Sequence, residues 1–166
     1  MTEVLSRVPD DFLRRKTLTA QCEATMKTVI DYGEFGIGVT DEPAAHGGGS
    51  AGPSPLQAVL GALCGCEAVT FRRTSREMGF EYERLQFEGA FTIDIRGRMG
   101  DPDVRPHFQT VKLLITVVTN QSEESLASVI EETEARCPVM NLLIDAGVTL
   151  DVRWQLKPGL PVEANA

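Results

Sequence analysis

Two of the four cysteines, Cys66 and Cys137, occur in settings that suit thiol chemistry. Cys66 lies in a strongly apolar stretch that follows the Gly-Pro-Ser-Pro segment 52–55, and Cys137 follows an acidic segment and directly precedes Pro138. A thiolate can attack an oxidant, and a second thiol can then trap the sulfenic acid product as a disulfide. If the fold brings these two residues together, the pair predicts a thiol peroxidase.

Each cysteine also has a simpler interpretation, because free cysteine is among the residue types most often buried as a small apolar side chain. Cys22 fits that interpretation best, since it lies on the apolar face of a predicted strand. Cys64 and Cys66 are two positions apart in a predicted helix and point about 200° apart, so they do not form a C-x-x-C redox pair. Arg136 is the neighbouring cation that could lower the pKa of the Cys137 thiol.

Metal binding and Cys–His acyl transfer are the rival uses of these side chains. Zinc takes about four ligands at characteristic spacings. The sequence contains no C-x₂-C or H-x₃-H element, so we expect no metal, and we also expect no cofactor. The side chains that such a site could draw on are Cys64, Cys66, Cys137, His46 and His107.

The composition indicates an ordinary globular chain. With 166 residues we expect one domain over 1–166, with an N-terminal extension over 1–16 and a frayed tail over 158–166. The net charge of −8 argues against a nucleic-acid partner. We find no signal peptide and no apolar run long enough to cross a membrane, so we expect a cytoplasmic protein with reduced thiols and no membrane partner.

The hydrophobic patterns predict an α+β fold with antiparallel sheets, because strand pairs joined by short loops occur together with long helices. The strands alternate apolar and polar residues, whereas the helices carry apolar stripes and clear start and stop signals. The predicted strands are 17–30, 35–39, 82–96, 107–119 and 148–157; the predicted helices are 55–78, a helix from Ser122 to a break at Cys137-Pro138, and 139–146.

The helix over 55–78 should position Cys66. Ser54 is a good N-cap, Pro55 suits the first helical position, and Gly79 provides a left-handed stop. The first half of this helix is apolar on all sides, so we expect it to be buried nearly everywhere, with the charged second half emerging from the core. A single antiparallel sheet covers only one side of such a helix. A dimer that buries the helices of two chains between two sheets is the simplest arrangement.

Three segments, in this order and spacing, resemble the OsmC/Ohr family of thiol-dependent hydroperoxide reductases. They are 52–57 (GPSPLQ), 65–70 (GCEAVT) and 137–143 (CPVMNLL), and segment 95–108 resembles one branch of the family. The resemblance extends over 17–157. It implies an OsmC-like fold in an intertwined homodimer, an organic hydroperoxide substrate, an external dithiol reductant and an antioxidant role in the stress response. It also implies that Cys66 is the peroxidatic thiol and Cys137 the resolving thiol.

The Arg and Glu that accompany the peroxidatic thiol in that family have no direct counterparts here. No Arg occurs between Lys16 and Arg72, and the residues directly after Pro55 include no carboxylate. An amide at this position can still hydrogen-bond to a substrate, and a cation from the other subunit could replace the missing Arg. The predicted substrate-binding residues are Gln57, Val59, Leu63 and Arg105.

The sequence leaves two functions open. Val59 and Leu63 would give the thiol an apolar lining, which favours organic hydroperoxides over hydrogen peroxide. The same lining would suit a dimer of this fold that binds an apolar small molecule, or senses redox state, without catalysis. The missing Arg and Glu favour this second function, whereas the presence of both Cys66 and Cys137 favours the enzyme.

Overall fold

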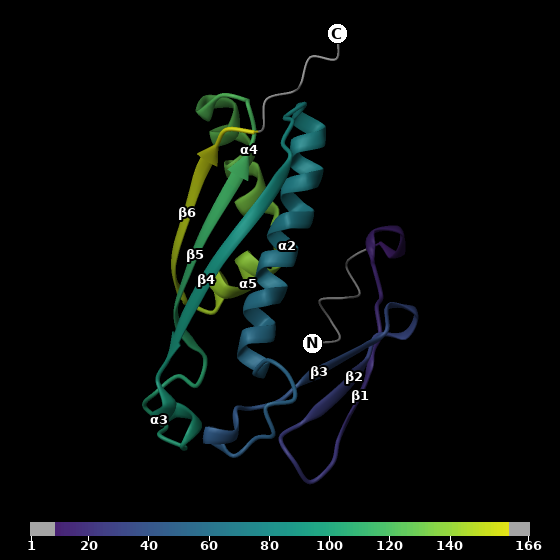
Figure 1. Ribbon diagram of the computed structural model, residues 1–166, viewed down its shortest axis with the longest axis vertical. Helices are drawn as coiled ribbons and strands as arrows, with labels where there is room; N and C mark the ends of the chain where they lie inside the picture. The colour runs from purple at the N-terminus through teal and green to yellow at the C-terminus, as the bar shows by residue number, and fades with distance from the viewer. Residues whose placement is uncertain (1–8, 160–166) are drawn as a thin grey trace. The chain divides into compact units, whose positions relative to one another are not determined.

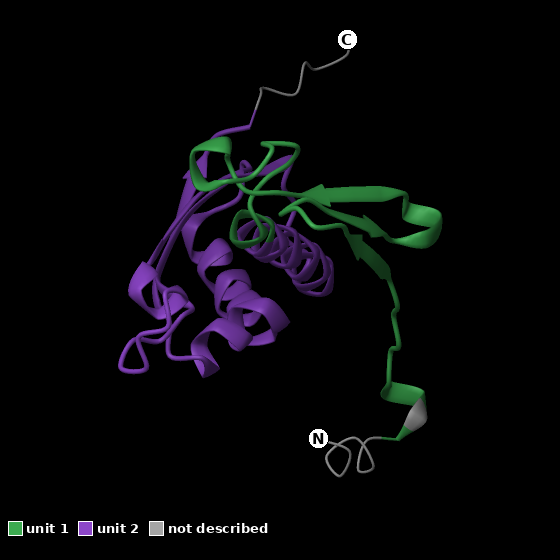
Figure 2. Ribbon diagram, turned by 90° about the horizontal axis from the view of Figure 1, so that it is seen from below, with its two compact units in different colours: residues 1–58 green, residues 59–166 purple. Residues whose placement is uncertain are grey.

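The computed structural model describes residues 9–159, and the chain divides into two compact units, 1–58 and 59–166 (Figure 2). Helices and sheets occur together, which confirms the predicted α+β class. Parts of the predicted extension and tail, 1–8 and 160–166, lie outside the described residues. Within the described range, none of the helices combines the length and the hydropathy needed to span a membrane.

The first unit contains a three-stranded antiparallel sheet (Figure 1). Its strands are β1 (Thr19–Cys22), β2 (Thr28–Asp31) and β3 (Ile37–Thr40), and the predicted return strand corresponds to β3. The single strand predicted over 17–30 is wrong, because the chain reverses at 23–27 and folds β2 back onto β1. Thr25 makes this turn: its backbone N–H donates to the carbonyl of Glu23 at 2.6 Å, and its hydroxyl accepts from the N–H of Lys27 at 3.2 Å.

Cys22 is exposed, so its predicted burial in a core is wrong. It ends β1, a strand whose residues are all exposed. Its thiol donates to the carbonyls of Glu23 and Thr25, at 3.2 Å each. The Cys22 thiol therefore belongs to the turn that follows β1, and these bonds give no evidence that it takes part in a functional site.

A buried carboxylate holds the glycine-rich loop after β3. Asp41 is 1 % exposed and accepts hydrogen bonds from the backbone N–H groups of Glu42, Gly49 and Ala51. These bonds, led by the one from Ala51, lower the pKa of Asp41 even though burial opposes them. At Gly48, a Cβ atom would lie 1.9 Å from the carbonyl oxygen of Glu42, so only glycine fits there. The loop is therefore an ordered structure around one acidic side chain.

The second unit contains the sheet β4-β5-β6 with helices against one of its faces (Figure 1). The strands are β4 (Arg84–Ile93), β5 (Phe108–Val118) and β6 (Thr149–Lys157). The β4–β5 pair is antiparallel as predicted, but β5 and β6 are parallel. This difference arises because the two helices between β5 and β6 carry the chain back across the sheet, which a parallel pair requires.

Helix α2 (Pro55–Met78) has the predicted bounds, and its start is a capping box. The Gln57 N–H donates to the Ser54 hydroxyl at 3.3 Å, and the Ser54 N–H donates to Oε1 of Gln57 at 3.0 Å. Gly79, with φ of 69°, ends the helix. The expected burial of its first half is not found within one chain. The fully buried side chains lie mainly further along the helix: Leu63, Glu67, Thr70, Phe71, Thr74 and Ser75.

The loop between β4 and β5 contains the short helix α3 (Ile95–Arg98), and two further helices follow β5. They are α4 (Glu123–Arg136), which Ser122 caps, and α5 (Pro138–Asp145), and the predicted break between them at Cys137 is confirmed. The core of the unit joins α2, α4 and the sheet around Phe71. This core consists of Phe71, Phe80, Val117, Leu126 and Val129, with Tyr82, Leu85, Ile130, Trp154 and Leu156 packed against it.

Candidate functional site

Three reactive side chains come together where α2 packs beside the α4–α5 break. Cys66 and Glu67 are neighbours on α2, and Cys137 lies 71 residues after Cys66, between α4 and α5. Cys66 is half-buried and Cys137 is fully buried, and both are free thiols. The side chains of Cys66 and Glu67 both act on the pKa of Cys137, so the three groups are close neighbours.

The helix break positions Cys137 through local hydrogen bonds. The Cys137 N–H donates to the carbonyl of Thr133, which closes α4, and its carbonyl accepts from the Asn141 N–H at 3.0 Å, which opens α5. The side-chain amide of Asn141 donates to the same carbonyl at 2.9 Å and to those of Glu134 and Ala135. Pro138 has no N–H to satisfy at the first position of α5. These hydrogen bonds hold the backbone at Cys137 and so determine the position of its thiol.

Burial, and after it the carboxyl of Glu67, raises the pKa of the Cys137 thiol to about 12. The expectation that Arg136 lowers this pKa is wrong. The guanidinium of Arg136 pairs with the exposed carboxylates of Glu77, at 2.6 Å, and of Glu132, and it is not among the groups that act on Cys137. The structure thus holds Cys137 as a neutral thiol at neutral pH.

Glu67 is the residue of this site that the sequence analysis missed. Its side chain is 0 % exposed, and neither carboxylate oxygen has a hydrogen-bond partner among the described residues. Burial raises the pKa of Glu67, and the negative charge of Glu134 raises it as well. The nearby Cys137 thiol lowers this pKa, although it does not form a regular hydrogen bond with the carboxyl group. Helical spacing places Glu67 on the same stripe as Leu63 and Phe71, and a carboxylate on a core stripe is the signal that could have identified it.

Glu67→Gln is expected to stabilise the protein at pH 7 and to change its stability little at pH 4. The folded carboxyl keeps its proton above its ordinary pKa of 4.5, whereas the unfolded carboxyl loses it, so wild-type stability falls as the pH rises above that value. Each unit of raised pKa corresponds to about 1.4 kcal/mol. Urea unfolding of both proteins across this pH range measures the difference. The control is Glu131→Gln, which makes the same change at an exposed residue of α4. If the stability of the wild type and that of Glu67→Gln depended on pH in the same way, the prediction would be contradicted.

The structure places the predicted substrate-binding residues at different distances from the thiols. Leu63 is buried one helical turn before Cys66, whereas Val59 is exposed on α2. Gln57 lies more than two turns before Cys66, and its amide oxygen is used in the capping box. Arg105 donates to the Ala146 carbonyl at 3.5 Å, at the end of α5 opposite Cys137. Leu63 lies within one helical turn of Cys66 on α2, and the substrate-binding roles given to all four residues remain predictions.

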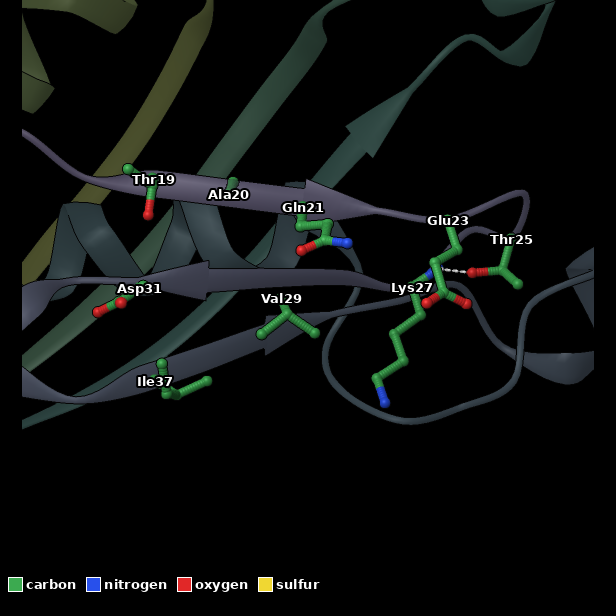
Figure 3. Close-up of a pocket in the computed structure, with 9 residues that line it drawn as sticks. All are labelled: Thr19, Ala20, Gln21, Glu23, Thr25, Lys27, Val29, Asp31 and Ile37. Atoms are coloured by element: carbon green, nitrogen blue, oxygen red, sulfur yellow. Dashed lines mark hydrogen bonds between the residues drawn. The ribbon is translucent and has the colours of Figure 1, made fainter.

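Among the residues that the structure describes, the remaining polar features do not form a second candidate site. Cys64 is half-buried, and burial followed by the charge of Glu67 raises its pKa. No group of three metal-ligating side chains occurs within residues 9–159. A hollow of about 550 Å³ lies on the β1-β2-β3 sheet (Figure 3), but no cysteine or histidine lines it. The residues of this hollow are Thr19, Ala20, Gln21, Glu23, Thr25, Lys27, Val29, Asp31 and Ile37.

The fold and the thiol pair define an α+β protein with two neighbouring cysteines contributed by a long helix and a helix break. The protein-family model described as "OsmC-like protein" matches residues 47–153, well over half of the chain. The chain therefore belongs to the OsmC family. Among proteins with curated functions, none matches this sequence.

Solved structures share the fold over nearly their whole length. An OsmC-like protein from Mycoplasma pneumoniae is 18 % identical with a TM-score of 0.72, over 88 % of this chain and 98 % of that chain. The organic hydroperoxide resistance protein OhrB of Bacillus subtilis is 17 % identical with a TM-score of 0.60, over 87 % and 98 %. An organic hydroperoxide resistance protein OsmC from Legionella pneumophila is 14 % identical with a TM-score of 0.62, over 87 % and 98 %. At these identities the likeness establishes the fold.

Proposed function

We propose that this protein is a thiol-dependent peroxidase that reduces organic hydroperoxides, with Cys66 as the peroxidatic thiol and Cys137 as the resolving thiol. The observation that carries the proposal is the pairing of a half-buried thiol with a fully buried one in a member of the OsmC family. The partly exposed Cys66 can meet an oxidant that enters from solvent. Cys137 is shielded from direct oxidation and is available to the oxidised Cys66.

The oxidation and reduction take place at the two thiols and consume one hydroperoxide and one external dithiol. The Cys66 thiolate attacks the distal oxygen of the hydroperoxide; the O–O bond breaks, and the organic alkoxide leaves and takes up a proton to become the alcohol. The sulfur of Cys137 then attacks the Cys66 sulfenic acid, which forms the disulfide and releases water. A dithiol reduces the disulfide by exchange and becomes a disulfide itself.

Two features favour an organic substrate. The buried Leu63 gives Cys66 an apolar neighbour one turn away, and Val59 adds an apolar side chain to the same helix. The proteins from Bacillus subtilis and Legionella pneumophila that share the fold carry names that refer to organic hydroperoxide resistance. An antioxidant role in the stress response would follow from this activity.

The direct test is mass spectrometry of the protein after addition of one equivalent of cumene hydroperoxide. We expect a single disulfide between the peptides that contain Cys66 and Cys137, formed together with one equivalent of the alcohol. Cys64→Ser is the matched control on α2 and should form the same disulfide. A disulfide that contains Cys22 or Cys64 would show that the assignment of the two thiols is wrong.

The alternative is a dimer of the same fold that binds an apolar small molecule or senses redox state without turnover. The specific observation in its favour is the pKa of about 12 for Cys137, since a neutral thiol reacts slowly. A protein that binds cumyl alcohol but consumes no hydroperoxide in the presence of dithiothreitol would have this second function.

We also propose that the protein is a homodimer in which α2 is covered by the partner chain. In one chain, Val59 and Val69 of α2 are exposed, with Val69 at 54 %. The first unit likewise exposes Val29 and Ile37 on its sheet. Large exposed apolar areas of this kind typically mark interfaces between proteins.

Val69→Asp is expected to weaken this dimer by about tenfold or more, because it places a charge in a desolvated apolar interface. Size-exclusion chromatography with light scattering should give twice the mass of one chain for the wild type and a concentration-dependent shift toward one chain for the variant. Ala127→Asp, which places the same charge at an exposed small residue of α4, is the control. A wild-type protein that has the mass of one chain at all concentrations would contradict the proposed dimer.

A further inference from the structure

Glu67 is a carboxyl group in an energetically unfavourable position. It is fully buried, and both of its oxygens lack a hydrogen-bond partner in the described part of the chain. Burying an unpaired polar group costs free energy, and native proteins contain few such groups. No cation among residues 9–159 contributes to the pKa of Glu67. Such a feature calls for a reason other than stability.

Its surroundings supply that reason. Glu67 directly follows Cys66 in the chain, and its carboxyl and the Cys137 thiol each act on the pKa of the other. The other ionisable groups that face it are Glu134, whose carboxylate accepts from Trp154 Nε1 at 2.8 Å, and Cys64. Since Glu134 already has a hydrogen-bond donor, Glu67 is the buried acid whose oxygens remain available to the two thiols.

The disulfide-forming step requires a proton carrier at this place. The Cys137 thiol is neutral at neutral pH, but sulfur attacks as the thiolate, so a base must remove its proton. The leaving group of a sulfenic acid is hydroxide, which needs a proton to leave as water. One group that accepts the first proton and returns it to the hydroxide satisfies both requirements, and acid–base assistance of this kind typically contributes 10²–10⁴-fold in rate.

We propose that Glu67 is the proton carrier of disulfide formation: its carboxylate takes the Sγ proton of Cys137 as that sulfur attacks Sγ of Cys66, and the resulting carboxylic acid protonates the departing hydroxide. The S–S bond forms and the S–O bond breaks. The Cys137 sulfur is oxidised, the Cys66 sulfenic sulfur is reduced, and the Cys137 proton leaves in the water molecule. Glu67 ends this step as the carboxylate with which it began.

The preceding and following steps keep the proton count balanced. When the hydroperoxide reacts, the departing alkoxide takes the proton of the Glu67 carboxylic acid, which leaves the carboxylate. When an external dithiol reduces the disulfide, one of its two protons goes to Cys137 and the other goes to Cys66 or Glu67, so these two neighbours begin the next cycle with one proton between them. The inference rests on the proposed function, because it assumes a sulfenic acid at Cys66.

The test is a single-turnover reaction of the full-length protein with one equivalent of cumene hydroperoxide, followed over time by dimedone trapping and mass spectrometry. Trapping measures the Cys66 sulfenic acid, and the intact mass measures the disulfide. In Glu67→Gln we expect disulfide formation to be at least about 100-fold slower than in the wild type, so that the sulfenic acid accumulates. Glu67→Asp should restore part of the rate. Glu77→Gln, at an exposed position of the same helix, should match the wild type.

The pH profile separates proton transfer from a merely structural effect. In Glu67→Gln only the ionised Cys137 reacts, so the rate of disulfide formation should rise about tenfold per unit between pH 7 and 9. The wild-type rate should vary much less over this range. Circular dichroism confirms folding of the isosteric variant.

The two ways in which this test can fail are distinguishable. If the wild type forms neither the Cys66 sulfenic acid nor the Cys66–Cys137 disulfide, the proposed function fails, and the role of Glu67 fails with it. If the wild type forms the disulfide and Glu67→Gln forms it within threefold of the same rate at every pH, the proposed function stands and the proton-carrier role is overturned.

Discussion

Cys66→Ser is expected to abolish the consumption of organic hydroperoxide in the presence of dithiothreitol, with a loss of roughly three orders of magnitude or more. Removal of a catalytic nucleophile has effects of this size because no neighbouring group replaces it. Here the neighbouring thiol is Cys137, which is fully buried with a pKa of about 12, and it cannot take over the attack on peroxide. Peroxide consumption measured with cumene hydroperoxide gives the rate.

The companion variant separates the two thiols by their products. In the absence of a reductant, Cys137→Ser should react once and then stop, with one sulfenic acid per chain that dimedone can trap. Cys64→Ser, which changes the other α2 thiol, should keep turnover close to that of the wild type. Equal rates of peroxide consumption in the wild type, Cys66→Ser and Cys137→Ser would exclude the proposed enzyme.

Phe71→Ala is expected to lower the free energy of unfolding by about 3–5 kcal/mol, a range typical of large aromatic side chains removed from a core. Phe71 is 0 % exposed and lies at the centre of the aromatic cluster of the second unit. Its ring stacks on Trp154 at 5.2 Å between centroids and meets the edge of Tyr82 at 5.0 Å. Truncation would leave a cavity between α2 and the sheet.

Denaturant unfolding, followed by the fluorescence of the single tryptophan and by circular dichroism, measures this loss. Phe35→Ala is the control, because Phe35 is 78 % exposed in the first unit, in the turn before β3, and its removal should change the free energy of unfolding by less than about 0.5 kcal/mol. If the two variants were equally stable, the packing around Phe71 would not be the main source of stability in the second unit.

The elements with local signals could be predicted from the sequence. Helix α2 has its predicted bounds because Ser54, Pro55 and Gly79 determine its ends through their own backbone chemistry. The break at Cys137-Pro138 is confirmed for the same reason. The strand predicted over 17–30 is wrong because its turn contains neither Gly nor Pro, and the apolar–polar alternation continues across it.

The elements that depend on distant parts of the chain could not be predicted in this way. The parallel pairing of β5 with β6 follows from how two helices cross the sheet, and the spacing of residues within a strand does not contain that information. The pairing of Cys66 with Cys137 could be expected from the resemblance to a family, but not from their spacing. Glu67 was missed because a charged residue on a helix is usually exposed to solvent, and only the packing of α2 shows that this one is buried.

The position of Cys137 between two helices has a mechanical consequence. A covalent bond from this point to the middle of α2 would close a ring of about 70 residues, which contains β4, β5 and α4. In the chain-entropy model, closing such a ring lowers the entropy of the unfolded chain and so raises the free energy of unfolding by about 4 kcal/mol. The oxidised protein would therefore have a higher melting temperature than the reduced one. In the proposed cycle, the stability of most of the second unit would rise when the disulfide forms and fall when it is reduced.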